Sequence, residues 1–274
     1  MPVTAVQHIR RMRGGAQSHL MRCSDANFYV VKFQNNPQHL RVLANELIAT
    51  RLAERAGLPV PQTEVVEVPE WLIAHTPELT VQLASQSIRC QPGLQFGSRF
   101  VVDPLGGQVF DYLPEPALAR VRNLEAFAGM LALDKWTCNA NGRQAAFWRR
   151  QRERRYNVTF IDQGYCFNAG EWTFPDSPLR GVYMRNEVYA WVTGWDSFEP
   201  WLSRLESLEE KEVWACAEQV PPEWYTADWE GMERLVALLY RRRERIRALI
   251  DEFRLSSRQP FPLWTAAVMA VGHA

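Results

Sequence analysis

The sequence predicts an α+β fold in two lobes, because strand-like segments dominate before about residue 110 and helix-like segments dominate after it. A turn-rich stretch, Asp103-Pro104-Leu105-Gly106-Gly107, separates the two patterns and is typical of a linker. With 274 residues and 47% apolar content, the chain can bury the core that such a fold requires. We therefore predict an N-terminal lobe over residues 1–103, β-rich with one helix, and a mostly helical C-terminal lobe over residues 104–274.

The N-terminal lobe is predicted to combine three strands with one helix. The first strand is rich in aromatic and β-branched residues, and its period of two places Lys32 on the same face as Phe28 and Val30. The helix has apolar residues at helical spacing and is expected to end at Gly57. The predicted boundaries are 28–33, 64–68 and 96–102 for the strands and 37–56 for the helix.

The C-terminal lobe is predicted to begin with a helix and a hairpin. Asn123 is a candidate N-cap, and the apolar spacing after it predicts a helix that runs directly into Asp134. Two short strands, 144–148 and 157–161, are predicted next, joined by an arginine-rich turn. The second strand ends just before Asp162, and beyond about residue 185 the pattern is helical.

Two motifs in the C-terminal lobe carry the strongest chemical signal. Asp134 is followed five residues later by Asn139, and Asp162-Gln163-Gly164 follows a predicted strand. A carboxylate that orients a hydroxyl, together with amide and carboxylate oxygens that hold Mg²⁺, is what phosphoryl transfer from ATP requires. We predict that Asp134 accepts or orients the acceptor's proton, that Asn139 and Asp162 bind Mg²⁺, and that Gly164 allows the turn after Asp162. Asn141 is an alternative metal ligand if the loop is wound differently.

The N-terminal lobe supplies matching groups for the nucleotide. Lys32 is expected to contact the phosphates of ATP, and Glu46, 14 residues later on the predicted helix, is expected to hold its ammonium group. The loop over residues 13–19 is expected to cover the phosphates, because glycines let backbone N–H groups approach an anion closely. The loop residues predicted to bind the nucleotide are Gly14, Gly15, Gln17 and Ser18.

Together these segments resemble the HipA-like kinase family of bacteria. The resemblance spans roughly residues 10–255 and is carried by Gly14-Gly15-Ala16-Gln17, Val31-Lys32-Phe33, Asn45-Glu46-Leu47, Gly57-Leu58-Pro59-Val60-Pro61, Asp134 to Asn139, and Ile161-Asp162-Gln163-Gly164. It implies a two-lobed protein-kinase-like fold, ATP with Mg²⁺, and phosphorylation of a protein Ser or Thr. It also implies that Asp134, Asn139 and Asp162 match the family's catalytic and metal positions.

Three alternative functions remain open. A small-molecule or lipid kinase would use the same side chains, because they serve any hydroxyl acceptor. The loop with only two glycines would suit a catalytically inactive nucleotide-binding module that acts through partner contacts. An RNA-binding protein would use the arginine turn over residues 149–155, but the 31 basic and 31 acidic residues balance, which argues against nucleic acid.

Composition bounds the compartment and the partners. The five cysteines are scattered and odd in number, without a Cys-x-x-Cys pair, which favours a reducing, cytoplasmic compartment over a disulfide framework or a zinc site. No stretch reaches the roughly 20 apolar residues of a membrane span, so no membrane partner is expected. The expected partners are ATP, a protein substrate, and an antitoxin-like or regulatory protein.

Overall fold

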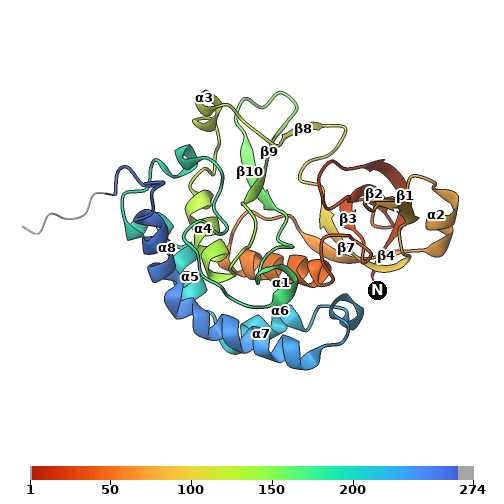
Figure 1. Ribbon diagram of the computed structural model, residues 1–274. Helices are drawn as coiled ribbons and strands as arrows, with labels where there is room; N and C mark the ends of the chain where they lie inside the picture. The colour runs from red at the N-terminus through yellow and green to blue at the C-terminus, as the bar shows by residue number, and fades with distance from the viewer. Residues whose placement is uncertain (1, 265–274) are drawn as a thin grey trace, which may run out of the picture.

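The computed structural model describes residues 2–264. A β-barrel forms one end of the molecule and a mostly helical body forms the other, with helix α1 between them (Figure 1). Residues 265–274, the last stretch of the predicted C-terminal lobe, lie outside the described residues. The strands are β1 (Val3–Arg11), β2 (His19–Cys23), β3 (Phe28–Lys32), β4 (Thr63–Val68), β5 (Thr80–Gln82), β6 (Ser87–Arg89), β7 (Gly93–Arg99), β8 (Gly107–Phe110), β9 (Gln144–Arg150) and β10 (Asn157–Ile161). The α-helices are α1 (Val42–Ala56), α2 (Glu70–His75), α3 (Glu115–Leu118), α4 (Ala126–Trp136), α5 (Trp201–Glu206), α6 (Glu210–Ala217), α7 (Trp229–Arg242) and α8 (Ile246–Arg254).

Five strands close the barrel in the order β1-β2-β3-β7-β4. Strand β1 was not among the predicted strands, yet it closes the barrel by pairing in parallel with β4, where Val3 lies beside Val66. Closure leaves no unpaired strand edge, and alternate side chains such as Met21 and Val31 fill the interior. Strand β7 begins at Gly93, earlier than predicted. Phe96, in its middle, pairs with Lys32, the last residue of β3.

Helix α1 is buried on nearly every side, which is typical of a helix inside a protein rather than on its surface. It begins at Val42, later than predicted, because the residues from Pro37 onward form turns. The predicted end is confirmed: Gly57 has φ 76° and donates its backbone N–H to the carbonyl of Glu54 at 2.9 Å. A polar pair on α1, Asn45 and Glu46, is buried along with its apolar residues.

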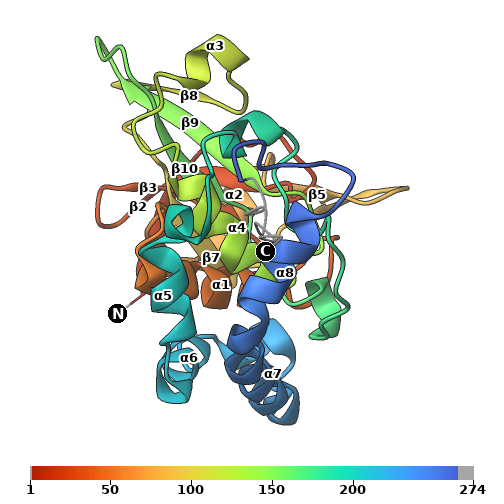
Figure 2. The same cartoon turned by 90° about the vertical axis from the view of Figure 1, so that its left-hand side faces the viewer.

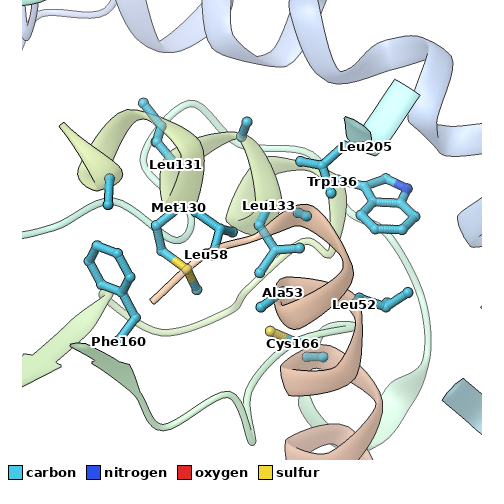
Figure 3. Packing of buried hydrophobic residues seen from close by; sticks show 14 of the residues in the cluster. Leu52, Ala53, Leu58, Met130, Leu131, Leu133, Trp136, Phe160, Cys166 and Leu205 are labelled. Atoms are coloured by element: carbon cyan, nitrogen blue, oxygen red, sulfur yellow. The ribbon is translucent and has the colours of Figure 1, made fainter. Parts of the chain in front are cut away.

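The core joins α1 to the helices after residue 104. Figure 3 shows Leu52 and Ala53 of α1 in one hydrophobic cluster with Leu133 and Trp136 of α4 and with Leu205 of α5. A second, smaller cluster lies inside the barrel. Because α1 belongs to the larger cluster, the buried apolar residues do not divide at residue 103.

The second sheet has the order β10-β9-β8, and its antiparallel hairpin confirms the two strands predicted around the arginine-rich turn. Phe147 pairs with Val158 in the middle of this hairpin, and both are buried. Figure 2 shows the hairpin extending away from the helical body beside α3. The arginine-rich turn is therefore at the exposed end of the hairpin, whereas residues 145–147 of β9 and 158–160 of β10 are buried.

Asn123 does not cap the helix as predicted. Helix α4 begins at Ala126, and its cap position, Glu125, has no side-chain cap. The Asn123 side chain instead exchanges two 2.9 Å hydrogen bonds with the backbone N–H and carbonyl of Val158. It thereby attaches the start of the helix to β10, because its amide offers both a donor and an acceptor.

The C-terminal helices surround α4. The indole N–H of Trp136 donates to the carbonyl of Leu239 in α7 at 2.8 Å, and α8 packs against α4. Leu235 of α7 and Ile250 of α8 are buried, whereas arginines occupy the outer faces of both helices. Within residues 2–264, none of these helices has both the length and the apolar character that crossing a bilayer demands.

We predict that Gly129→Ala destabilises the protein. In a helix interior, alanine is normally more stabilising than glycine by about 1 kcal/mol. At Gly129, however, a Cβ would lie closer to the Trp201 ring than real Cβ atoms come to any neighbour. Overpacking of this kind costs about 1–3 kcal/mol, so we expect a net loss in the free energy of unfolding, measured with urea.

A matched background separates the clash from the helix propensity. In Trp201→Leu the ring is absent, so adding Gly129→Ala should no longer reduce stability. Equal stability of Gly129→Ala and the unchanged protein would contradict the packing account.

Candidate active site

Three charged side chains meet between the barrel and the helical body: Lys32, Glu46 and Asp162. The ammonium group of Lys32 donates a 2.6 Å hydrogen bond to Asp162 Oδ1 and a short one to Glu46 Oε1. The three side chains are only 9%, 3% and 14% exposed, in that order. Strand β3, helix α1 and the end of β10 therefore bring together three of the predicted site residues, although Lys32 and Asp162 lie 130 positions apart.

Glu46 connects this trio to the backbone after β10. Its Oε2 accepts from the N–H of Gln163 at 3.0 Å, and its Oε1 accepts from the N–H of Gly164 at 2.8 Å. A Cβ on Gly164 would lie 2.6 Å from the Val42 side chain, so glycine is required there to let α1 come close. Gly164 was predicted to allow the turn after Asp162, but the residue with left-handed backbone in this turn is Asp162 itself, at φ 64°.

The trio sets the charge state of its members. Burial opposes the charged form of Lys32, but the Glu46 and Asp162 carboxylates outweigh it and raise the pKa of Lys32 above its ordinary value. Burial also opposes ionisation of Asp162, but the Lys32 ammonium outweighs it and holds the pKa of Asp162 below its usual range. For Glu46, burial dominates over Lys32 and raises its pKa. Near pH 7 the site thus offers a cation, Lys32, beside an ionised carboxylate, Asp162.

Asp134 lies apart from the trio and is fully buried. Arg143 donates to both of its oxygens, from Nε to Oδ2 at 2.9 Å and from Nη2 to Oδ1 at 2.5 Å, and Asn139 Nδ2 donates to Oδ1 at 2.9 Å. Gly181 covers it so closely that a Cβ there would lie 2.5 Å from Asp134 Cβ. The structure therefore does not bring the Asp134 carboxylate to a surface where an acceptor hydroxyl could reach it.

Asn139 is buried beside Asp134 and uses both ends of its amide internally. Its Nδ2 binds Asp134, and its Oδ1 accepts from the backbone N–H of Asn141 at 3.0 Å. The alternative ligand, Asn141, is exposed. Within this loop, the side chains after Asn139 are therefore more accessible to a ligand than Asn139 itself.

Two functional neighbours were missed by sequence reasoning, Arg143 and Gln144. Arg143 Nη1 donates to the carbonyl of Ile161 at 2.8 Å and to Gln163 Oε1 at 2.6 Å, so it binds the residues on both sides of Asp162. Gln144 donates a short hydrogen bond to Asp162 Oδ2. A lone arginine and a glutamine at the start of a strand carry no signal of their own; only the predicted pairing of 144–148 with 157–161 could have placed them beside Asp162.

The glycine-containing loop connects β1 to β2, as its predicted role requires, and Gly14 has φ 112°, which favours glycine. The Gln17 side chain is occupied elsewhere, because it exchanges hydrogen bonds of 2.7 and 2.8 Å with the backbone of Gln82. Ser18 is buried. Neither side chain lies with the trio, so the loop can offer a ligand its backbone but not these two side chains.

A cavity of about 490 Å³ lies beside β3, which carries Lys32, and β10, which ends just before Asp162. Phe28, Trp148 and Thr159 line it together with residues 99–104. Phe28 is on β3 with Lys32, Trp148 is on β9 with Gln144, and Thr159 is on β10, which ends before Asp162. At about 3.3 Å per strand residue, these three lining residues lie roughly 10–13 Å along the chain from Lys32, Gln144 and Asp162, respectively.

Comparison with models of protein families shows which family this chain belongs to. The model of the family described as HipA-like kinase matches residues 5–253. The chain belongs to the HipA-like kinase family. It is therefore a kinase, and the resemblance predicted from the sequence motifs is confirmed.

Solved structures show the same fold at low sequence identity. The Helicobacter pylori proinflammatory kinase CtkA matches this kinase with 12% identity and a TM-score of 0.54, covering 89% of this chain and 99% of CtkA. A Golgi casein kinase matches with 12% identity and a TM-score of 0.54, covering 92% of this chain and 74% of that one. The fold is thus protein-kinase-like with mixed α and β content. No curated protein sequence matches the chain significantly.

We predict that Arg143→Met strongly destabilises this kinase. The substitution leaves the Asp134 carboxylate buried without its cation, and breaking a buried ion pair in this way costs about 3–5 kcal/mol. Urea unfolding measures the loss, with Arg150→Met as the control, because Arg150 is an exposed arginine at the far end of β9. The double variant Asp134→Leu/Arg143→Met should cost less than the sum of the two single variants. Strictly additive losses would show that the pair does not act as a unit.

Proposed function

We propose that this kinase transfers the γ-phosphoryl group of Mg·ATP to a hydroxyl acceptor, and that the acceptor is a Ser or Thr of a protein. The observation that carries the proposal is the buried trio of Lys32, Glu46 and Asp162. A cation and an ionised carboxylate held side by side provide what a triphosphate with its divalent cation needs. The proposal keeps the predicted nucleotide-binding lobe over residues 1–103 and the catalytic lobe over residues 104–274, which would enclose the nucleotide between them.

Each member of the trio has a distinct part in the proposed reaction. Lys32 donates to phosphate oxygens, and Glu46 keeps its ammonium group in place. Asp162 offers a carboxylate oxygen to Mg²⁺, for which hard oxygen donors are the fitting ligands. When bound, the metal would neutralise charge on the phosphates. The backbone of the loop at Gly14 and Gly15 would cover the phosphates from above, without the side chains of Gln17 and Ser18.

The cavity lined by Phe28 and Trp148 suits the base of the nucleotide. Its volume falls in the range of small-molecule sites, and the aromatic side chains Phe28, Phe100 and Trp148 line it together with polar residues that include Asn27, Gln62 and Arg99. Its distance from the trio leaves room for ribose and phosphates between base and metal. A Golgi casein kinase of similar fold has been solved with Mn/ADP bound, at 12% identity and a TM-score of 0.51, covering 92% of this chain and 74% of that one, which supports a divalent metal and a nucleotide here.

For Asp134 we propose a positioning role in place of the predicted proton acceptor. Its oxygens are occupied by Arg143 and Asn139, and its side chain is closed off by Gly181. Arg143 in turn binds the residues on both sides of Asp162. Asp134 therefore acts on the site by fixing the guanidinium group that holds Asp162 in its left-handed turn.

A second candidate is a nucleotide-binding module without transfer activity. The enclosed position of Asp134 favours it, because the carboxylate expected to receive the acceptor's proton is out of reach. Tight nucleotide binding without formation of ADP would identify this case. A small-molecule acceptor, the other alternative, would be distinguished by screening peptides against sugars, nucleosides and lipid head groups.

We predict that Asp162→Ala reduces ADP formation from ATP at least 100-fold. Removing one group that stabilises the reacting phosphates typically costs about 10²–10³ in rate. The measurement is ADP release in the presence of a mixed Ser/Thr peptide library, with Lys32→Met tested alongside. Asp111→Ala, which removes an exposed aspartate, should keep the full rate. Equal rates for Asp162→Ala and the unchanged kinase would refute the proposed function.

A further inference from the structure

Asp162 shares its two oxygens between two partners, and only one of them has a part in the proposed function so far. Lys32 binds Oδ1, and Gln144 binds Oδ2 through its side-chain amide. Gln144 is the first residue of β9 and is exposed, whereas Asp162 is nearly covered. A ligand that approaches the open side of Asp162 therefore meets the Gln144 amide as well.

A cation at Asp162 needs further oxygen ligands. Among residues 2–264, no three His, Cys, Asp or Glu side chains gather in a way that could hold a metal ion. Mg²⁺ commonly takes one or two protein ligands and completes its shell with phosphate oxygens and water. An amide oxygen beside Asp162 would meet this need without a second carboxylate.

Asn139 is not positioned to supply that amide oxygen. Its Oδ1 accepts from the backbone of Asn141, its Nδ2 is bound to Asp134, and its side chain is 1% exposed. Gln144, by contrast, already contacts Asp162. Rotation of its terminal amide would present Oε1 where Nε2 now lies, and the two ends of an amide differ little in shape.

The support beneath Gln144 is rigid. Its Cα pairs with that of Ile161 in the β9–β10 ladder, one residue before Asp162. The preceding residue, Arg143, is fixed by Asp134 and by the backbone of Ile161. Side chains on strands that are held from behind keep the geometry a metal ligand requires.

We propose that Gln144 is the second protein ligand, together with Asp162, of the divalent cation that accompanies the nucleotide. This inference rests on the proposed function and adds to it the residue that completes the cation's protein ligands. It also explains why the amide of Asn139, five residues after Asp134, can be buried: Asn139 binds Asp134 and the loop backbone, and Gln144 provides the oxygen for the cation.

The test is binding of Mn²⁺ in the presence of saturating ADP, followed by the electron paramagnetic resonance signal of free Mn²⁺. We expect Gln144→Ala to weaken Mn²⁺ binding at least about tenfold, as losses at metal sites typically do. Gln144→Glu should bind Mn²⁺ as tightly as the unchanged kinase or more tightly, because a carboxylate oxygen replaces the amide oxygen. Gln151→Ala, which removes an exposed glutamine on the distal turn of the hairpin, should have no effect.

A second measurement separates ligation from a structural role. Affinity for ADP in the presence of EDTA, measured by calorimetry, should be the same for Gln144→Ala and the unchanged kinase. Loss of this metal-free affinity, or unchanged Mn²⁺ binding by Gln144→Ala, would overturn the inference and leave the proposed function standing. Loss of Mn²⁺ binding in Asn141→Ala but not in Gln144→Ala would also overturn it. Failure of the unchanged kinase to bind Mn²⁺ with ADP would overturn the proposed function as well.

Discussion

The rest of this structure depends on the hydrogen bonds that the buried carboxylate of Glu46 accepts. It accepts hydrogen bonds from Lys32 on β3 and from two backbone N–H groups after β10, so barrel, helix and second sheet meet at one side chain. A charge removed from water is stable only when it is compensated in this way. Because all three elements contribute to the compensation, the position of α1 and the position of Asp162 cannot change independently.

Neighbouring polar groups extend this constraint to the segment that follows Asp162. Asn45, next to Glu46 on α1, donates to the carbonyls of Gly164, Cys166 and Ala169. His39 also contacts the Gly164 carbonyl, at 2.8 Å. One buried helix, α1, thus carries both the carboxylate that holds Lys32 and the amide that binds the backbone leading away from Asp162.

Asp134 and Asn139 show how a correct motif can be given an incomplete interpretation. Their spacing was part of the pattern that indicated the right family, but spacing along a chain does not reveal which side of a loop a side chain faces. A carboxylate at the end of a fully buried helix such as α4 must be paired, and Arg143 is close enough to pair with it. Arg143 of the same pair also binds Ile161 and Gln163, the residues on either side of Asp162, so Asp134 is linked to Asp162 through this arginine.

By itself, the sequence determined the local elements and the charged residues that they carry: strand β3 with Lys32, helix α1 with Glu46, and the hairpin that leads to Asp162, because period, turn residues and apolar runs are local properties. Its pattern also revealed the kinase family. Only the tertiary structure decided that β1 closes the barrel, that Asn123 binds β10, and that Arg143 and Gln144 flank Asp162. These contacts depend on pairings between segments far apart in the chain, and a single arginine or glutamine has no periodic pattern from which its partner could be predicted.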